Sequence, residues 1–80
     1  MSKVIERGHH AERLLQDPLI VEALESIEHA LREAWDSANT TEFREEVWYT
    51  LKGMQRFTQY LRLAVEQGDF EVALKEKRNG

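Results

Sequence analysis

The chain contains no cysteine, a single proline and only four glycines among its 80 residues. Without cysteine, neither a disulfide nor a thiolate metal site can stabilise the domain. The scarcity of glycine and proline argues against a disordered chain. A chain of this length forms one domain at most, and it buries only about 60% of its unfolded surface. Its stability must therefore come from helix packing, from self-association, or from both.

Long apolar runs are also missing. No segment approaches the roughly 20 apolar residues of a membrane span, and the first residues lack the apolar stretch of a signal peptide. We therefore expect a cytoplasmic protein with no membrane partner.

The charge is unevenly distributed along the chain. Its net value is −4, yet residues 17–38 contain six acids and a single arginine, a net charge of −5. Residues 47–65 contain three cations, Lys52, Arg56 and Arg62, and no acid. The two segments are therefore electrostatically complementary.

Polar breaks divide the sequence into helical segments. At the first break, Asp17 suits an N-cap and Pro18 suits the first position of the helix that follows. The polar cluster SANTT at 37–41 offers threonines as caps for a further helix. A weaker break lies at Gly68, because glycine is favoured just after a helix ends. The sequence predicts one domain with helices at 3–16, 18–38 and 41–68, and a short tail helix at 69–77.

Apolar residues recur at alternating intervals of four and three in both long segments, which is a helical seam. The first seam comprises Ile20, Leu24, Ile27, Leu31, Ala34 and Ala38. The second comprises Phe43, Val47, Thr50, Met54, Phe57, Leu61, Ala64 and Gly68. Because the loop between them is short, the two helices should form an antiparallel hairpin, with the first helix lying across it.

A second apolar stripe lies beside each seam, which is more than a two-helix hairpin can bury. It is formed by Leu19, Ala23, Ala30 and Trp35 on one helix, and by Trp48, Leu51, Tyr60 and Val65 on the other. The first helix can cover one stripe and leaves the other for a second chain. We therefore expect a homo-oligomer, with a dimer favoured. The expected interface residues are Leu19, Ala23, Trp35, Trp48, Leu51 and Val65.

Two spacings of histidine and glutamate raise the question of a metal site. Glu6 and His9 have the i, i+3 spacing of a di-iron ligand pair, and Glu25 and His29 are i, i+4. However, a di-iron bundle requires carboxylates that project inward, and the acids of residues 17–38 fall off the seam. We favour a solvated acidic surface, with no metal and no cofactor.

No arrangement of residues indicates catalysis. The serines lack His and Asp partners at a strained turn, and the chain has no glycine-rich phosphate loop. We expect a protein without enzymatic activity.

One face of the third segment combines cations with tyrosines. Such side chains can hold phosphates and stack on bases, so nucleotide or nucleic-acid binding is an alternative function. The residues of this face are Tyr49, Lys52, Arg56, Tyr60 and Arg62. Because the whole chain is acidic, it attracts a polyanion poorly at long range. We favour pairing of this basic stretch with the acidic segment 17–38, within one chain or across a dimer.

Two tryptophans, Trp35 and Trp48, stand on either side of the predicted loop and should be neighbours at the closed end of the hairpin. They have two interpretations. They can cap the core, which we favour, or they can anchor a partner, because tryptophan is enriched at interface hot spots.

The order of capping and hydrophobic residues resembles a known group of proteins. The stretches concerned are RGHHAERLLQDPLIVEALESIEHALREAW, then REEVWYTLKGMQRFTQYL, then EQG, within residues 7–68. They are similar to small helical proteins encoded by tailed bacteriophages and prophages, which have no firmly assigned activity and whose genes tend to lie among phage structural genes. The resemblance implies a phage origin and a role in assembly or host interaction, and it transfers no catalytic residue.

Together these patterns predict an all-α protein. A short N-terminal helix precedes a long antiparallel hairpin and a short C-terminal helix, and self-association completes a bundle. The expected function is non-enzymatic: protein–protein contacts in virion assembly, or binding of a host or defence component, in the host cytoplasm or on the virion.

Overall fold

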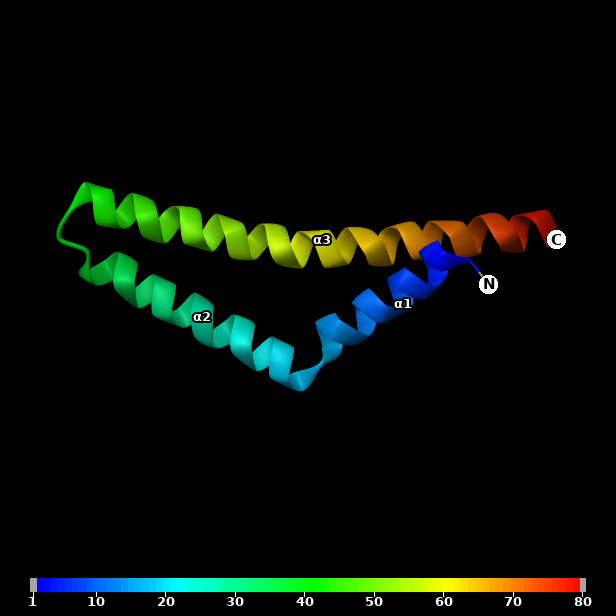
Figure 1. The fold of residues 1–80 in the computed structure, drawn as a ribbon, viewed down its shortest axis with the longest axis horizontal. Coiled ribbons are helices and arrows are strands. Elements are labelled where there is room, and N and C mark those ends of the chain that lie inside the picture. Colours follow the sequence, from blue (N-terminus) through cyan, green and yellow to red (C-terminus); the bar gives the residue numbers. More distant parts are fainter. Residues whose placement is uncertain (1, 80) are drawn as a thin grey trace.

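Two helices lie end to end along a third, longer one and form a single layer with it (Figure 1), and Cα extents of 60 × 23 × 16 Å make that layer long and flat. The computed structural model describes residues 2–79. Within them, α1 spans Lys3–Gln16, α2 spans Pro18–Ser37 and α3 spans Thr41–Asn79, and no strand is present. The fold is all-α, as the sequence predicts.

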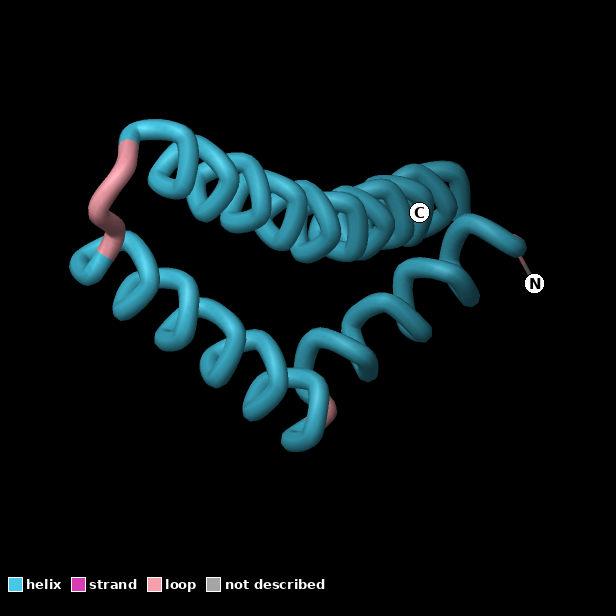
Figure 2. The backbone as a smooth tube through the Cα atoms, turned by 60° about the vertical axis from the view of Figure 1, so that its left-hand side comes forward, coloured by secondary structure: helices cyan, strands magenta, loops and turns pink. Residues whose placement is uncertain are grey.

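The 39-residue helix α3 is the spine of the layer. Both α1 and α2 run antiparallel to it: α2 lies along its N-terminal half and α1 along its C-terminal half (Figures 1 and 2). The chain bends between α1 and α2, and this bend is the part of the layer that stands farthest from α3. Helix α1 therefore lies beyond the end of α2 and not across the hairpin, and it makes the more extensive contact with α3.

The predicted capping signals are confirmed at both helix starts that follow a break. Asp17 Oδ1 accepts hydrogen bonds from the backbone N–H of Leu19 at 2.8 Å and of Ile20 at 3.2 Å. Thr40 Oγ1 accepts from the N–H of Phe43 at 3.1 Å. Each side chain satisfies donors that have no partner within the helix, which typically stabilises a helix by about 1 kcal/mol. These two caps fix where the bend and the loop occur.

Glycines hold α1 against α3. A Cβ atom added to Gly8 would lie 2.9 Å from the carbonyl oxygen of Ala64 and 3.0 Å from Cα of Gly68. A Cβ atom added to Gly68 would lie 3.1 Å from Cα of Gly8 and 3.3 Å from the carbonyl oxygen of Val4. The two backbones therefore touch where neither helix carries a side chain, and Ile5, Ala11 and Ala64 are buried around this contact.

The break predicted at Gly68 is wrong. Residues 69–77 are helical as expected, but they continue α3 without interruption. Gly68 ends a helix only if it adopts positive φ, and no described glycine does so. Its role here is close helix contact, which a sequence pattern cannot distinguish from a helix end.

The seam predicted for α3 is correct at most of its positions. The inward positions that match are Val47, Met54, Leu61, Ala64 and Gly68. In contrast, Phe43, Thr50 and Phe57 are exposed, and Leu51 and Thr58 face the other helices in place of the last two. The reason is geometric: residues three and four positions after an inward residue lie on opposite flanks of it, and the other helices pack against the flank of Leu51 and Thr58. Spacing alone does not choose between the two flanks.

The seam of α2 is largely confirmed. Five of its six members are half-buried toward α3: Ile20, Leu24, Leu31, Ala34 and, just after the helix, Ala38. Ile27 is the exception, because it remains 47% exposed.

Very little of the chain is buried. The buried hydrophobic residues are Ile5, Ala11, Val47 and Ala64, and among the described residues twelve large hydrophobic side chains remain between 37 and 70% exposed. The radius of gyration is 17.5 Å, whereas a compact domain of this length has about 12 Å. The molecule is an open layer without a closed hydrophobic core.

The glycine contact makes a prediction for stability. Gly8→Ala should lower the free energy of unfolding, because overpacking costs about 1–3 kcal/mol and the added methyl meets backbone atoms that cannot rotate away. The matched control is Gly53→Ala, whose Cβ meets nothing within 4 Å and which gains about 1 kcal/mol of helix propensity. Thermal unfolding followed by circular dichroism should place the two variants on opposite sides of the parent. Equal stabilities for the two variants would show that the close contact is absent.

Candidate protein-interaction surfaces

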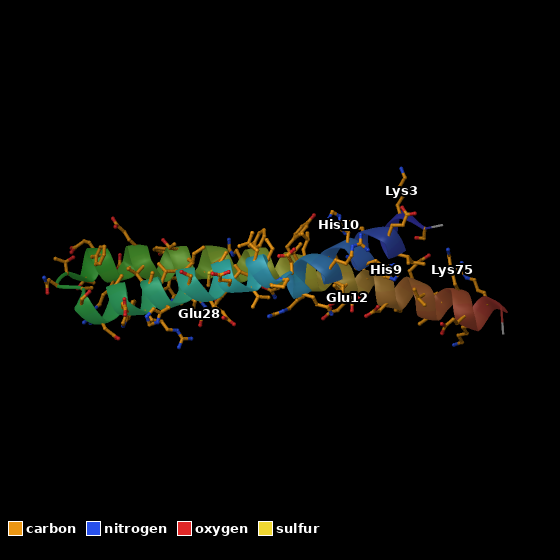
Figure 3. All side chains as sticks on the ribbon, turned by 90° about the horizontal axis from the view of Figure 1, so that it is seen from below. Lys3, His9, His10, Glu12, Glu28 and Lys75 are labelled. Atoms are coloured by element: carbon orange, nitrogen blue, oxygen red, sulfur yellow. The ribbon has the colours of Figure 1, made fainter. Side chains whose placement is uncertain are left out.

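The layer has two broad sides, and neighbouring residues of a helix point to opposite ones. Consecutive helical residues are about 100° apart, so the residue before an inward residue and the residue after it face opposite sides. After the inward Leu31 comes Arg32, which lines a hollow on one side. After the inward Leu24 comes Glu25, which lines a hollow on that same side. In Figure 3, Glu28 projects from one side of the layer, and Lys3 and His10 project from the other.

An apolar groove opens on the first side, at the closed end of the hairpin. It has a volume of about 320 Å³ between α2 and α3. We call it the tryptophan groove, and its lining residues are Leu31, Arg32, Trp35, Asp36, Val47, Trp48 and Leu51. Trp35 and Trp48 are neighbours across it, as the sequence predicts.

The tryptophans are walls of this groove and not buried core, because they remain 40% and 45% exposed. Cations hold both rings. The Arg44 guanidinium lies 5.7 Å from the ring centroid of Trp35, and Lys52 Nζ lies 5.2 Å from that of Trp48. Such contacts are worth about 0.5–1 kcal/mol at exposed sites, so they orient the rings, and each cation occupies one face of its ring. An apolar floor with aromatic walls and a charged rim suits a large apolar side chain of a partner.

The first side continues toward the bend as a second hollow of about 320 Å³. Its lining includes apolar residues from all three helices, among them Leu15, Val21 and Met54. Glu25 and Glu28 of α2 line it together with Arg62 of α3. This is the place where α2 and α3 diverge because the bend stands away from α3.

The opposite side of the hairpin is smoother. The residues before the inward positions meet there: Ala23 and Ala30 on α2, and Gly53 and Tyr60 on α3. Small side chains alternate with exposed large ones. We call this surface the alanine face, and its apolar and small residues are Leu19, Ala23, Ile27, Ala30, Gly53, Phe57 and Tyr60. Glu46 and Thr50, which precede the inward Val47 and Leu51, lie on the same side.

The interface residues expected from the sequence lie on different surfaces. Leu19 and Ala23 lie on the alanine face, whereas Trp35, Trp48 and Leu51 line the tryptophan groove. Val65 is half-buried on the inner side of α3. The structure therefore divides the single expected interface into two opposite surfaces and an inward position, and the part these residues play in binding stays a prediction.

The tyrosine and cation face of α3 is exposed throughout but is partly occupied. Arg7 donates a hydrogen bond to the Tyr60 hydroxyl at 2.7 Å, and its guanidinium lies 5.2 Å from the Tyr60 ring centroid. Lys52 is held over Trp48, and the Tyr49 ring packs edge-on against the same tryptophan at 5.1 Å between centroids. Arg56 and Arg62 line one hollow together with Tyr60. The arrangement does not favour a phosphate-binding surface, which stays an untested alternative.

The acidic helix and the basic stretch form no ion pair with each other within residues 2–79. The ion pairs present both lie within α2: Arg32 with Glu28, and His29 Nε2 with Glu33 at 3.0 Å. Pairing within the chain is therefore not the outcome of this charge pattern in the part of the chain described.

The histidine and glutamate spacings do not assemble into a ligand cluster. His29 turns to Glu33 and not to Glu25. Across the described residues, no group of three or more His, Cys, Asp or Glu side chains has a geometry that holds a metal ion. In the same range, no helix has the length and apolar character needed to cross a membrane.

Comparison with protein-family models, with curated proteins and with solved structures found no match to the chain. The candidate surfaces therefore rest on the geometry of this chain alone.

Sequence reasoning missed the residues that fix α1 on α3. Arg7 bonds to Tyr60 and also donates to Gln67 Oε1 at 3.3 Å. Gly8, which as a glycine within a helix lowers helix propensity, is buried against Gly68. A signal was available, because Ala64 and Gly68 place two small residues four apart on one helix face, a spacing that lets backbones approach.

The exposure of the tryptophans makes a testable prediction. Trp48→Ala should cost well under the about 3–5 kcal/mol lost when a buried aromatic is truncated, because nearly half of the ring already contacts water. Ile5→Ala removes a smaller but buried side chain and should cost about 2–5 kcal/mol. Urea unfolding followed by circular dichroism compares the two variants. A greater loss for Trp48→Ala than for Ile5→Ala would make Trp48 part of the core.

Proposed function

We propose that this is a non-enzymatic protein that acts through protein–protein contacts and self-associates through its helix faces. The observation that carries the proposal is the exposure of apolar side chains on both sides of a layer in which, among residues 2–78, four hydrophobic residues are buried. Exposed apolar surface of this extent is typical of sites that bind other proteins. The fold without its partners is therefore one part of a larger assembly.

The tryptophan groove is the surface we assign to a different protein. It is concave and apolar, and it offers two tryptophans that cations hold in position. Tryptophan is among the residues enriched at interface hot spots, and a pocket of this kind accepts one anchoring side chain of a partner.

The biological setting of the proposal comes from the resemblance to small helical phage proteins. On that resemblance, the partner is a component of the phage particle, or a host or defence component of the infected cell. A component of the phage particle is present only in infected cells, whereas a host component is present before infection as well.

Capture of binding proteins tests the proposal. The immobilised parent and the Trp48→Ala variant are exposed to two lysates. One comes from bacteria that carry the phage or prophage encoding the chain, and the other comes from the same bacteria without it. We expect a protein that the parent retains and Trp48→Ala does not. Retention from infected cells alone indicates an assembly role, and retention from both lysates indicates a host component. If both baits retain the same proteins from each lysate, the groove is not a binding site and the proposal fails.

A further inference from the structure

The alanine face is a hydrophobic surface that, among the described residues, its own chain contacts at Tyr60, where Arg7 lies over the ring. Leu19 is 70% exposed and Phe57 53% exposed. Ala23, Ala30 and Gly53 between them present little side chain. Large residues next to small ones are what one helical layer needs in order to interdigitate with another. The face is therefore shaped to receive two more helices side by side.

We propose that a second copy of this chain covers the alanine face, with α2 of each copy lying antiparallel on α3 of the other. The twofold axis runs parallel to α3 between the two layers, and the two hairpins together form a four-helix arrangement. This inference rests on the self-association in the proposed function, and it names the surface and the orientation.

Charge decides the orientation. Two copies of a layer can meet face to face with the twofold axis along α3 or across it. With the axis along α3, the acidic α2 of one copy meets the basic stretch 47–65 of the other. With the axis across α3, the two α3 helices meet each other and their basic stretches face like charge. Because flanking charges select partner and orientation in helical bundles, the first arrangement is favoured.

The complementary charges remain available for this contact. In the described chain both ion pairs lie within α2, and neither includes Glu22 or Arg56. Leu24 and Met54 line the same hollow, so they lie in the same part of the antiparallel pair. Glu22 lies two residues before Leu24 and Arg56 two residues after Met54, which is toward the same end of that pair. In the dimer, the acidic stretch around Glu22 of one copy therefore lies in the same region as Arg56 of the other.

A stable interface needs about 800 Å² on each partner, so the contact between the two copies extends beyond the alanine face along the neighbouring turns of α2 and α3. Pairing through the alanine face leaves the tryptophan groove on the outer surface of both copies. The dimer then presents two identical grooves that face in opposite directions.

Cysteine substitution tests the orientation directly, because the chain has no cysteine of its own. Ala23 and Gly53 immediately precede Leu24 and Met54, so the proposed dimer brings Ala23 of one copy to Gly53 of the other. The single variants Ala23→Cys and Gly53→Cys are mixed, refolded together and oxidised. We expect the mixed disulfide to exceed both homodisulfides, because a disulfide requires Cα atoms within about 7 Å and identical positions lie on diagonally opposite helices.

A matched pair of charge variants provides the second measurement. Ala23→Glu places a carboxylate in the middle of the alanine face, and Ala73→Glu makes the same change at an exposed alanine near the end of α3. In sedimentation, we expect Ala73→Glu to remain a dimer like the parent and Ala23→Glu to shift to the 9.4 kDa chain. Both should keep the helical circular dichroism of the parent.

The outcomes that contradict the inference are distinct from those that contradict the proposed function. Predominant homodisulfides, or an Ala23→Glu variant that stays dimeric, would overturn the orientation while leaving self-association in place. A parent that sediments as a 9.4 kDa chain at every concentration would contradict both the proposed orientation and self-association itself.

Discussion

The contact between Gly8 and Gly68 determines what the rest of the chain does. Close approach of the two backbones commits α1 to the C-terminal half of α3, beyond the end of α2. Once α1 is placed there, it cannot cover the hairpin formed by α2 and the N-terminal half of α3. Both broad sides of that hairpin therefore remain open, and many apolar residues on them stay exposed. Exposure of the tryptophan groove and of the alanine face follows from this single packing choice.

The two halves of the layer differ in kind. Around the glycines, short side chains and touching backbones give a dense contact in which Ile5, Ala11 and Ala64 are buried. In the hairpin, most inward residues are only half-buried. Burying one large apolar side chain completely is worth about 1.5–3 kcal/mol, so the hairpin has much to gain from a second layer. The first half is self-sufficient, and the second half is suited to association.

Local signals in the sequence predicted the local structure well. Asp17 and Thr40 cap the helices that follow them, and Pro18 begins the helix after Asp17. Capping was predictable because it depends only on residues close in the sequence. The failures concern relationships between distant residues. Gly68 resembles a helix end until Gly8 is known to touch it. The seam of α3 was predicted through Thr50 and Phe57, whereas the other helices pack against the neighbouring Leu51 and Thr58, and spacing alone does not make that choice. The tryptophan pair was located correctly, but its exposure depends on where α1 packs. The small residues Ala64 and Gly68 indicate a close contact without naming the helix that makes it.

Hydrogen exchange measured as a function of protein concentration tests the central claim most directly, because it reports on each helix separately. Amide protection reflects the free energy of local opening. If a second copy completes the hairpin, amide protection in α2 should rise as the protein is concentrated. Amide protection in α1 and in the C-terminal half of α3 should exceed that of α2 in dilute solution and change little with concentration. Protection of α2 that is the same at every concentration and equal to that of α1 would contradict the account, because the hairpin would then be stable alone.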